Sequence, residues 1–259
     1  SRTKLQCTQR EVCIMGAFAG PAEWWTDSTS DGRNHIATKG IVQSGLVVNL
    51  DAGTLASYPG SGSTWTNLAP SATNNGNATL RTDEGYNLNG YAGITTSEGY
   101  FSQPRAYIPN PGGGAFATFT YSVWCYPTVL SGYQSIIDQD NDDFLFCFAG
   151  SGSLMIYDPN YTIPGFTAST NKWYNLVVTH TQGSPFTFYI DGVSVHTTAN
   201  DSTSHTFDNW SFGAGSVTSG SDGNEKFDGY MSSILIYNRA LTAAEVTQNY
   251  NATKGRYGY

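Results

Sequence analysis

Residues 186–198, "FTFYIDGVSVHTT", carry the pattern of a β-hairpin. Two apolar runs flank Asp191 and Gly192, and this pair suits the positive φ angles of a type I′ turn. Further strand patterns, rich in β-branched and aromatic residues, occur in "GLVVNLD", "WYNLVVTH" and "SSILIYN". Clusters of Gly and Asn separate these runs. Many short strands with turn residues between them predict an all-β fold, a two-sheet antiparallel β-sandwich.

One short helix is expected in "ALTAAEVTQNYN", near the C-terminal end of the chain. Thr242 followed by Glu245 forms a capping box, in which each side chain bonds a free backbone N–H at the start of the helix. Leu241 and Val246 occupy the hydrophobic staple positions around that cap. We expect the helix to end near Asn251 and to cover an edge or an end of the sandwich.

The charge balance excludes one class of partner. The chain of 259 residues has 12 Lys and Arg against 20 Asp and Glu, which gives a net charge of −8. No basic stripe is present to neutralise phosphates, so nucleic acid is not an expected partner. No apolar run is long enough to span a bilayer, so a membrane is not expected either. The low share of charged residues, 12%, is typical of secreted, extracellular or virion proteins rather than cytosolic enzymes.

Residues 1–43 differ from the rest because "AEWWTDSTSDGRNH" shows no strand alternation. We interpret residues 1–43 as an N-terminal arm or the end of a preceding module, and residues 44–259 as the folded domain. Trp24 and Trp25 are costly to leave in water, and they predict an interface with a neighbouring subunit. Deleting the arm is expected to leave a folded domain that no longer assembles.

The four cysteines are expected to play different parts. Cys125 and Cys147 lie in apolar strand patterns, and we expect both to be buried free thiols that act as small hydrophobic residues. Cys7 and Cys13 are close enough in sequence to close a small loop, but only in an oxidising compartment.

The stretch at residues 58–80, "YPGSGSTWTNLAPSATNNGNATL", has the composition of a flexible linker, except for Trp65 and Leu68. It overlaps the first of five motifs that follow one another in the chain: "SGLVVNLDAGTLASYPGSGSTWTNL", "GYFSQPRAYIPNP", "FTYSVWCYP", "NKWYNLVVTHTQGSPFTFYIDGVSV" and "FDGYMSSILIYNRALTAAEVTQNYNATKGRYG". Together these motifs resemble the concanavalin A-like, laminin G-like jelly-roll family, in the branch found in structural proteins of tailed, especially marine, bacteriophages. The resemblance covers about residues 41–259. It implies that residues 58–80 form a surface loop and turn of the sandwich, which Trp65 and Leu68 pin to the core.

The sequence shows no motif for catalysis. Jelly-roll glucanases that resemble this family use carboxylates spaced as ExDxxE on one strand, and no such spacing occurs here. A pair of carboxylates assembled from distant segments stays open. GxSxG and HExxH are also absent, and His180 and His196 are expected to be structural residues in or next to strands. We therefore do not expect an enzyme.

The run "DQDNDDF" carries a metal prediction. Asp138, Asp140, Asp142 and Asp143 crowd into one short segment before an apolar strand. Crowded carboxylates repel one another unless a cation neutralises them, and oxygen ligands suit Ca²⁺. The run therefore predicts a Ca²⁺ site, and the alternative is an ordinary solvated hairpin loop.

Aromatic residues in loop-like stretches offer a second kind of site, because flat rings stack on sugar rings. These residues are Tyr86, Tyr91, Tyr100, Tyr107, Tyr157 and Tyr161. The alternative for each is packing in the core or in a turn, and that is the interpretation we favour for most of them.

The function that the resemblance implies is non-enzymatic: a structural or adhesive component at the surface of a bacteriophage particle, of the tail-fibre, head-fibre or capsid-decoration type. The expected partners are other virion proteins, further copies of the chain in a homo-oligomer, and host-surface glycans. The alternative is a calcium-assisted, lectin-like carbohydrate-binding module. The same fold serves many functions, so the residues of the site must decide between them.

Overall fold

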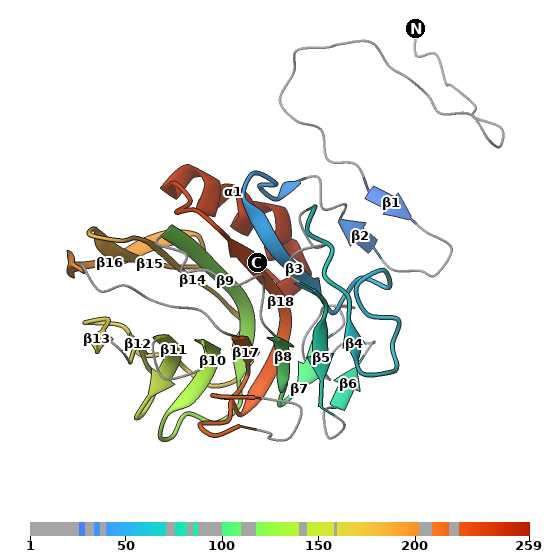
Figure 1. Ribbon diagram of the computed structural model, residues 1–259, viewed down its shortest axis with the longest axis horizontal. Helices are drawn as coiled ribbons and strands as arrows, with labels where there is room; N and C mark the ends of the chain where they lie inside the picture. The colour runs from blue at the N-terminus through green and yellow to red at the C-terminus, as the bar shows by residue number, and fades with distance from the viewer. Residues whose placement is uncertain are drawn as a thin grey trace, which may run out of the picture.

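The computed structural model describes residues 26–28, 34–36, 40–70, 76–81, 85–87, 100–109, 118–139, 144–157, 160–201, 209–217 and 223–259. Two large antiparallel sheets pack face to face (Figure 1). Sheet 1 contains, in spatial order, β13 (Tyr161–Thr162), β12 (Ser153–Ile156), β11 (Phe144–Ala149), β10 (Gln134–Gln139), β17 (Asn209–Phe212), β8 (Ala106–Pro109), β5 (Ala78–Leu80) and β4 (Thr64–Trp65). Sheet 2 contains β16 (Val193–Asn200), β15 (Pro185–Ile190), β14 (Tyr174–Thr181), β9 (Thr118–Pro127), β18 (Gly229–Tyr237), β7 (Tyr100–Ser102) and β6 (Gly85–Asn87), and β3 (Leu46–Asp51) also pairs with β18. The prediction of a two-sheet antiparallel β-sandwich is confirmed.

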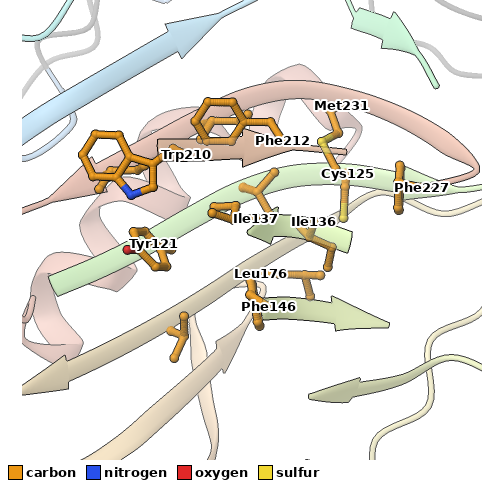
Figure 2. Close-up of a cluster of buried hydrophobic side chains, with 14 of the residues drawn as sticks. Tyr121, Cys125, Ile136, Ile137, Phe146, Leu176, Trp210, Phe212, Phe227 and Met231 are labelled. Atoms are coloured by element: carbon orange, nitrogen blue, oxygen red, sulfur yellow. The ribbon is translucent and has the colours of Figure 1, made fainter. Parts of the chain in front are cut away.

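The main core lies between the two sheets. Figure 2 shows Phe146 and Trp210 of sheet 1 beside Tyr121 and Leu176 of sheet 2, all of them buried. Strand alternation produces this arrangement, because every second side chain of a strand points to the same face. The thiol of Cys125 lies in the same core and is free, as predicted.

The hairpin prediction is also confirmed. β14, β15 and β16 form consecutive antiparallel pairs. Asp191 has a φ of 51° and Gly192 a φ of 77°, which are the positive angles that a type I′ turn requires.

The stretch 58–70 is a folded part of the domain. Trp65 is fully buried against Phe101, with ring centroids 4.7 Å apart, and Leu68 is half-buried. The Asn67 side chain accepts from the N–H of Asn49 at 2.8 Å and donates to the carbonyl of Val47 at 2.9 Å. These bonds attach the loop to β3, as the resemblance implies.

Helix α1 (Ala243–Thr253) begins with the predicted capping box and ends two residues beyond Asn251. Leu241 and Val246 are both buried in one cluster with the outward-facing side chains of Val177 and Leu235 from sheet 2. The helix therefore packs on the outer face of sheet 2, and it also contacts the edge strand β16. The reason is that sheet 2 carries apolar side chains on both faces, and the outer ones need a cover.

A short 3₁₀ helix, η3 (Lys254–Tyr257), continues along the same face. Tyr257 stacks on Trp124 with ring centroids 3.9 Å apart. The Arg256 guanidinium makes a bidentate ion pair with Asp51 of β3, at 2.6 and 2.7 Å. The C-terminal segment is thereby joined to one of the first strands of the domain.

The expected arm lies mostly outside the described residues. Its described part includes β1 (Thr26–Ser28) and β2 (Asn34–Ile36), which pair with each other. Strands of three residues are too short to show alternation, so the sequence did not reveal them. Ile41 and Val42 are buried in the cluster under α1, so the packed domain begins a few residues before position 44. None of the described helices has the length and the apolar composition needed to span a bilayer.

Candidate ligand-binding face

The outer face of sheet 1 carries an apolar floor on β11 and β12. Phe144, Phe146 and Phe148 point into the main core, so the alternate residues Leu145 and Cys147 point outward. Together with Met155 of β12 these outward side chains form a separate buried cluster. Cys147 is a free, buried thiol as predicted, and its burial, together with the nearby Glu225 and Asp138 carboxylates, raises its pKa.

Two exposed tyrosines meet above this floor. The rings of Tyr133 and Tyr157 lie edge to face, with centroids 5.5 Å apart. The exposed fractions are 46% for Tyr133 and 45% for Tyr157. Tyr157 continues β12, because its N–H donates to the carbonyl of Leu145 at 2.9 Å, and Tyr133 directly precedes β10. β11 lies between those two strands, so the rings meet over β11.

Asp138 lies beside the floor, on the same face. It pairs with Leu145 on one side and with Ser211 of β17 on the other. Asp138 is only 2% exposed, and its Oδ2 accepts a hydrogen bond of 2.7 Å from the N–H of Ser216. A backbone segment thus lies directly over this carboxylate.

Three side-chain oxygen atoms gather around Gly215. A Cβ atom placed on Gly215 would lie 2.6 Å from Asn224 Oδ1, 3.3 Å from Glu225 Oε2 and 3.6 Å from Asp138 Oδ2. Ser135, which pairs with Cys147, has a fully buried Oγ without a hydrogen-bond partner among the described residues. Carboxylate, amide and hydroxyl oxygens are the donor types that Ca²⁺ takes.

Of the metal and interface residues predicted from the sequence, the structure describes only Asp138. Asp138 is the fifth residue of β10 and not a loop residue; Asp140, Asp142 and Asp143 lie outside the described residues, as do Trp24 and Trp25. The part of the chain that is described holds no group of three or more His, Cys, Asp and Glu side chains that could hold a metal ion. The Ca²⁺ site at Asp138, Asp140, Asp142 and Asp143 therefore stays a prediction.

Several residues of this face were missed by the sequence reasoning. Tyr157 is one of the aromatic candidates of the sequence, but its partner Tyr133 is not. Asn224 and Glu225 reach Asp138 from a segment more than eighty positions away, and no local spacing indicates that approach. Tyr100, another of the aromatic candidates, is buried among aromatic rings on sheet 2.

These sheets and their packing define the concanavalin A-like class of β-sandwich. The family model described as the concanavalin A-like lectin/glucanases superfamily matches residues 95–247, and the chain belongs to this family. No curated protein sequence matches the chain significantly.

Solved structures with a similar fold are numerous. Domain 4 of the extracellular arabinanase AbnA from Geobacillus stearothermophilus, solved in complex with arabinotriose, has a TM-score of 0.57 at 15% identity, over 80% of this chain and 99% of that one. The binding domain of Paraclostridial Mosquitocidal Protein 1 has a TM-score of 0.58 at 16% identity, over 80% of this chain and 52% of that one. Trypanosoma rangeli sialidase in complex with sialic acid has a TM-score of 0.59 at 15% identity, over 90% of this chain and 36% of that one. At these identities the likeness shows the fold alone.

Proposed function

We propose that the chain is a non-enzymatic, adhesive domain that binds a glycan on the outer face of sheet 1. The observation that carries this proposal is the pair Tyr133 and Tyr157, whose rings are nearly half exposed above a buried apolar floor. Ligand sites combine apolar and aromatic surface with a few polar groups, and here the polar groups are the oxygens of Asn224 and Glu225 beside the floor.

The charge of the face indicates which glycans fit. Glu225 and Asp138 both act on the Cys147 thiol electrostatically, so two carboxylates lie close to the floor, and the whole chain carries a net charge of −8. An anionic polysaccharide would be repelled by this charge. Neutral glycans, which offer hydroxyl groups to carboxylate and amide oxygens, are the preferred class.

The test uses neutral polysaccharides as probes: linear arabinan, xylan and a β-1,4-glucan, each with its trisaccharide. Arabinotriose is included because the similar arabinanase domain was solved with it. Tyr157→Ala is expected to weaken binding about tenfold, the loss of one favourable aromatic contact. Tyr259→Ala is the matched control, because Tyr259 is 42% exposed but lies on sheet 2, beside Trp124. An equal loss of affinity in both variants, or no binding of any probe to the unmodified chain, would contradict the proposal.

The calcium-assisted form of this function is proposed together with it. The carboxylate of Asp138 would act with Asp140, Asp142 and Asp143 of the same run. An ion that binds only the folded protein stabilises it in proportion to ln(1 + [Ca²⁺]/Kd). The melting temperature is therefore expected to fall with a chelator and to recover with Ca²⁺, and Asp140→Ala should remove most of that response. A melting temperature that changes with neither the chelator nor Ca²⁺ would indicate that the run is an ordinary solvated loop.

The place of the domain at the surface of a bacteriophage particle rests on the resemblance of its sequence motifs. Its partners there would be other virion proteins and further copies of the chain. Mass spectrometry of purified particles, with antibody labelling of intact ones, tests this placement. Absence of the chain from particles would remove the virion assignment and leave the glycan-binding proposal standing.

A further inference from the structure

A backbone segment crosses the outer face of sheet 1 next to the tyrosine pair. We call this segment, residues 213–217, the strap. After β17 the chain turns at Gly213, whose φ is 76°, and comes back over its own strand. The N–H of Val217 donates to Ser211 Oγ at 2.9 Å, and Ser211 Oγ donates to the Val217 carbonyl at 3.3 Å. The N–H of Ser216 likewise donates to a side-chain oxygen, Asp138 Oδ2, at 2.7 Å.

Backbone hydrogen bonds to residues 224 and 227 also hold the strap in place. Gly215 exchanges two backbone hydrogen bonds with Asn224, at 2.8 and 3.0 Å, and Val217 is fully buried. A hydrogen bond of 2.8 Å runs from the N–H of Phe227 to the carbonyl of Gly213. The strap is therefore part of the packed structure and not a loose loop.

The strap interrupts a row of side chains that would otherwise run across the whole sheet. By strand register this row consists of Tyr157, Leu145, Asp138, Ser211, Tyr107, Thr79 and Thr64. Asp138 and Ser211 are buried beneath the strap, whereas Tyr107 and Thr79 beyond it are half-exposed and Thr64 is exposed. Tyr157 and Tyr107 stand about 19 Å apart, four strand spacings of about 4.8 Å, with the strap between them.

We infer that the glycan face accepts the end of a chain or a short branch, and that it does not accept the middle of an extended polymer. The inference rests on the proposed function, since it concerns the same tyrosine pair. A polymer lying across the strands would have to pass through the position of Ser216 and Val217. A terminal sugar can contact Tyr133 and Tyr157 while the rest of its chain leaves the surface before the strap.

The closing experiment measures stoichiometry and affinity by calorimetry on the intact chain, with linear arabino-, xylo- and cello-oligosaccharides of increasing length and their polymers. We expect a single protein for each linear chain, and an affinity per chain that stops rising after the shortest members of a series. Several proteins bound to each polymer, or affinity that continues to rise with length, would overturn the inference.

A pair of tyrosine variants supplies an independent arm. Tyr157→Ala is expected to weaken binding of the short oligosaccharides about tenfold, and Tyr107→Ala, beyond the strap, is expected to leave binding of short and long glycans unchanged. A loss for polymers in Tyr107→Ala, with short glycans unaffected, would show that the ligand crosses the strap; the glycan-binding proposal would survive that result. Failure of every glycan to bind the unmodified chain would overturn both proposals. Should Tyr107→Ala not fold, the stoichiometry of the unmodified protein decides alone.

Discussion

At the scale of single residues, two arginine–carboxylate pairs within the described part of the chain differ mainly in burial. Arg256 with Asp51 and Arg239 with Glu245 both make two short hydrogen bonds. The side chains are 7% and 9% exposed in the first pair, and 29% and 27% exposed in the second. Arg256→Ala leaves a carboxylate buried without its counter-ion, so we expect the free energy of unfolding to fall by about 3–5 kcal/mol. Arg239→Ala is the matched control and should cost about 1 kcal/mol or less. Urea unfolding of both variants measures the difference, and equal costs would refute it.

The buried pair also predicts how stability depends on pH. Burial alone would raise the pKa of Asp51, but the Arg256 guanidinium, the N–H of Gly53 and the hydroxyl of Thr54 together lower it below its usual value. A carboxyl group whose pKa is lower in the folded protein stabilises it above the pKa of the unfolded chain, about 4. That contribution is lost as the pH falls below about 4.

The measurement is the free energy of unfolding between neutral and acid pH, for the unmodified chain and for the double variant Asp51→Asn/Arg256→Gln. The double variant replaces both charges and keeps groups that can hydrogen-bond. We expect its stability to decline less steeply in acid. Glu245, whose pKa the side chain of Arg239 lowers to about 2, is present in both proteins and does not affect the comparison. Parallel acid curves would show that Asp51 is not the group responsible.

At the scale of the secondary-structure elements, the turn between β15 and β16 makes a specific steric prediction. Gly192 has a φ of 77°, and a Cβ atom there would lie 2.8–2.9 Å from the side chain of Tyr250 in α1. Gly183 has a φ of 82°, but a Cβ atom there would meet nothing within 4 Å. Gly183→Ala should therefore cost only the conformational penalty, about 1–2 kcal/mol. Gly192→Ala should cost measurably more in urea unfolding, because the hairpin must also move away from the helix. Equal costs would mean that the contact with Tyr250 relaxes freely.

The elements also show what the sequence can and cannot reveal. The hairpin and the capping box were predictable because each depends on residues within a few positions of one another, such as Asp191 and Gly192 or Thr242 and Glu245. The candidate binding face was not predictable, because its geometry comes from register between distant strands. In β10 the pairing with β11 shifts between Ser135 and Ile137, and such an irregularity decides which side chains reach the outer face. Asp138 could be singled out as an acidic residue, but its burial under Ser216 could not be foreseen from its neighbours in sequence.

At the scale of the whole molecule, the two ends of the chain are expected to differ in their importance for folding. Residues 243–259 bury Val246 against the outer face of sheet 2, stack Tyr257 on Trp124 and supply Arg256 to Asp51. Deleting this segment exposes those apolar side chains and leaves Asp51 without its partner, so we expect no stable domain. Deleting residues 1–39 should leave a folded domain, since the packed part of the chain includes Ile41 and Val42. Circular dichroism and thermal melting of the two truncated chains make the comparison, and an unfolded product of the N-terminal deletion would contradict the assignment of an arm.

The position of β18 has a consequence for how the protein is made. This strand comes near the end of the described chain, yet it pairs with β9 along one edge and with β3 and β7 along the other. During synthesis β3 and β7 leave the ribosome long before β18 exists, so β3 lacks the strand that it pairs with and β7 has only β6 beside it. Nascent chains that stop before residue 229 should thus be open to proteases and should engage chaperones. Protection should appear in a single step, once β18 and the segment after it have emerged.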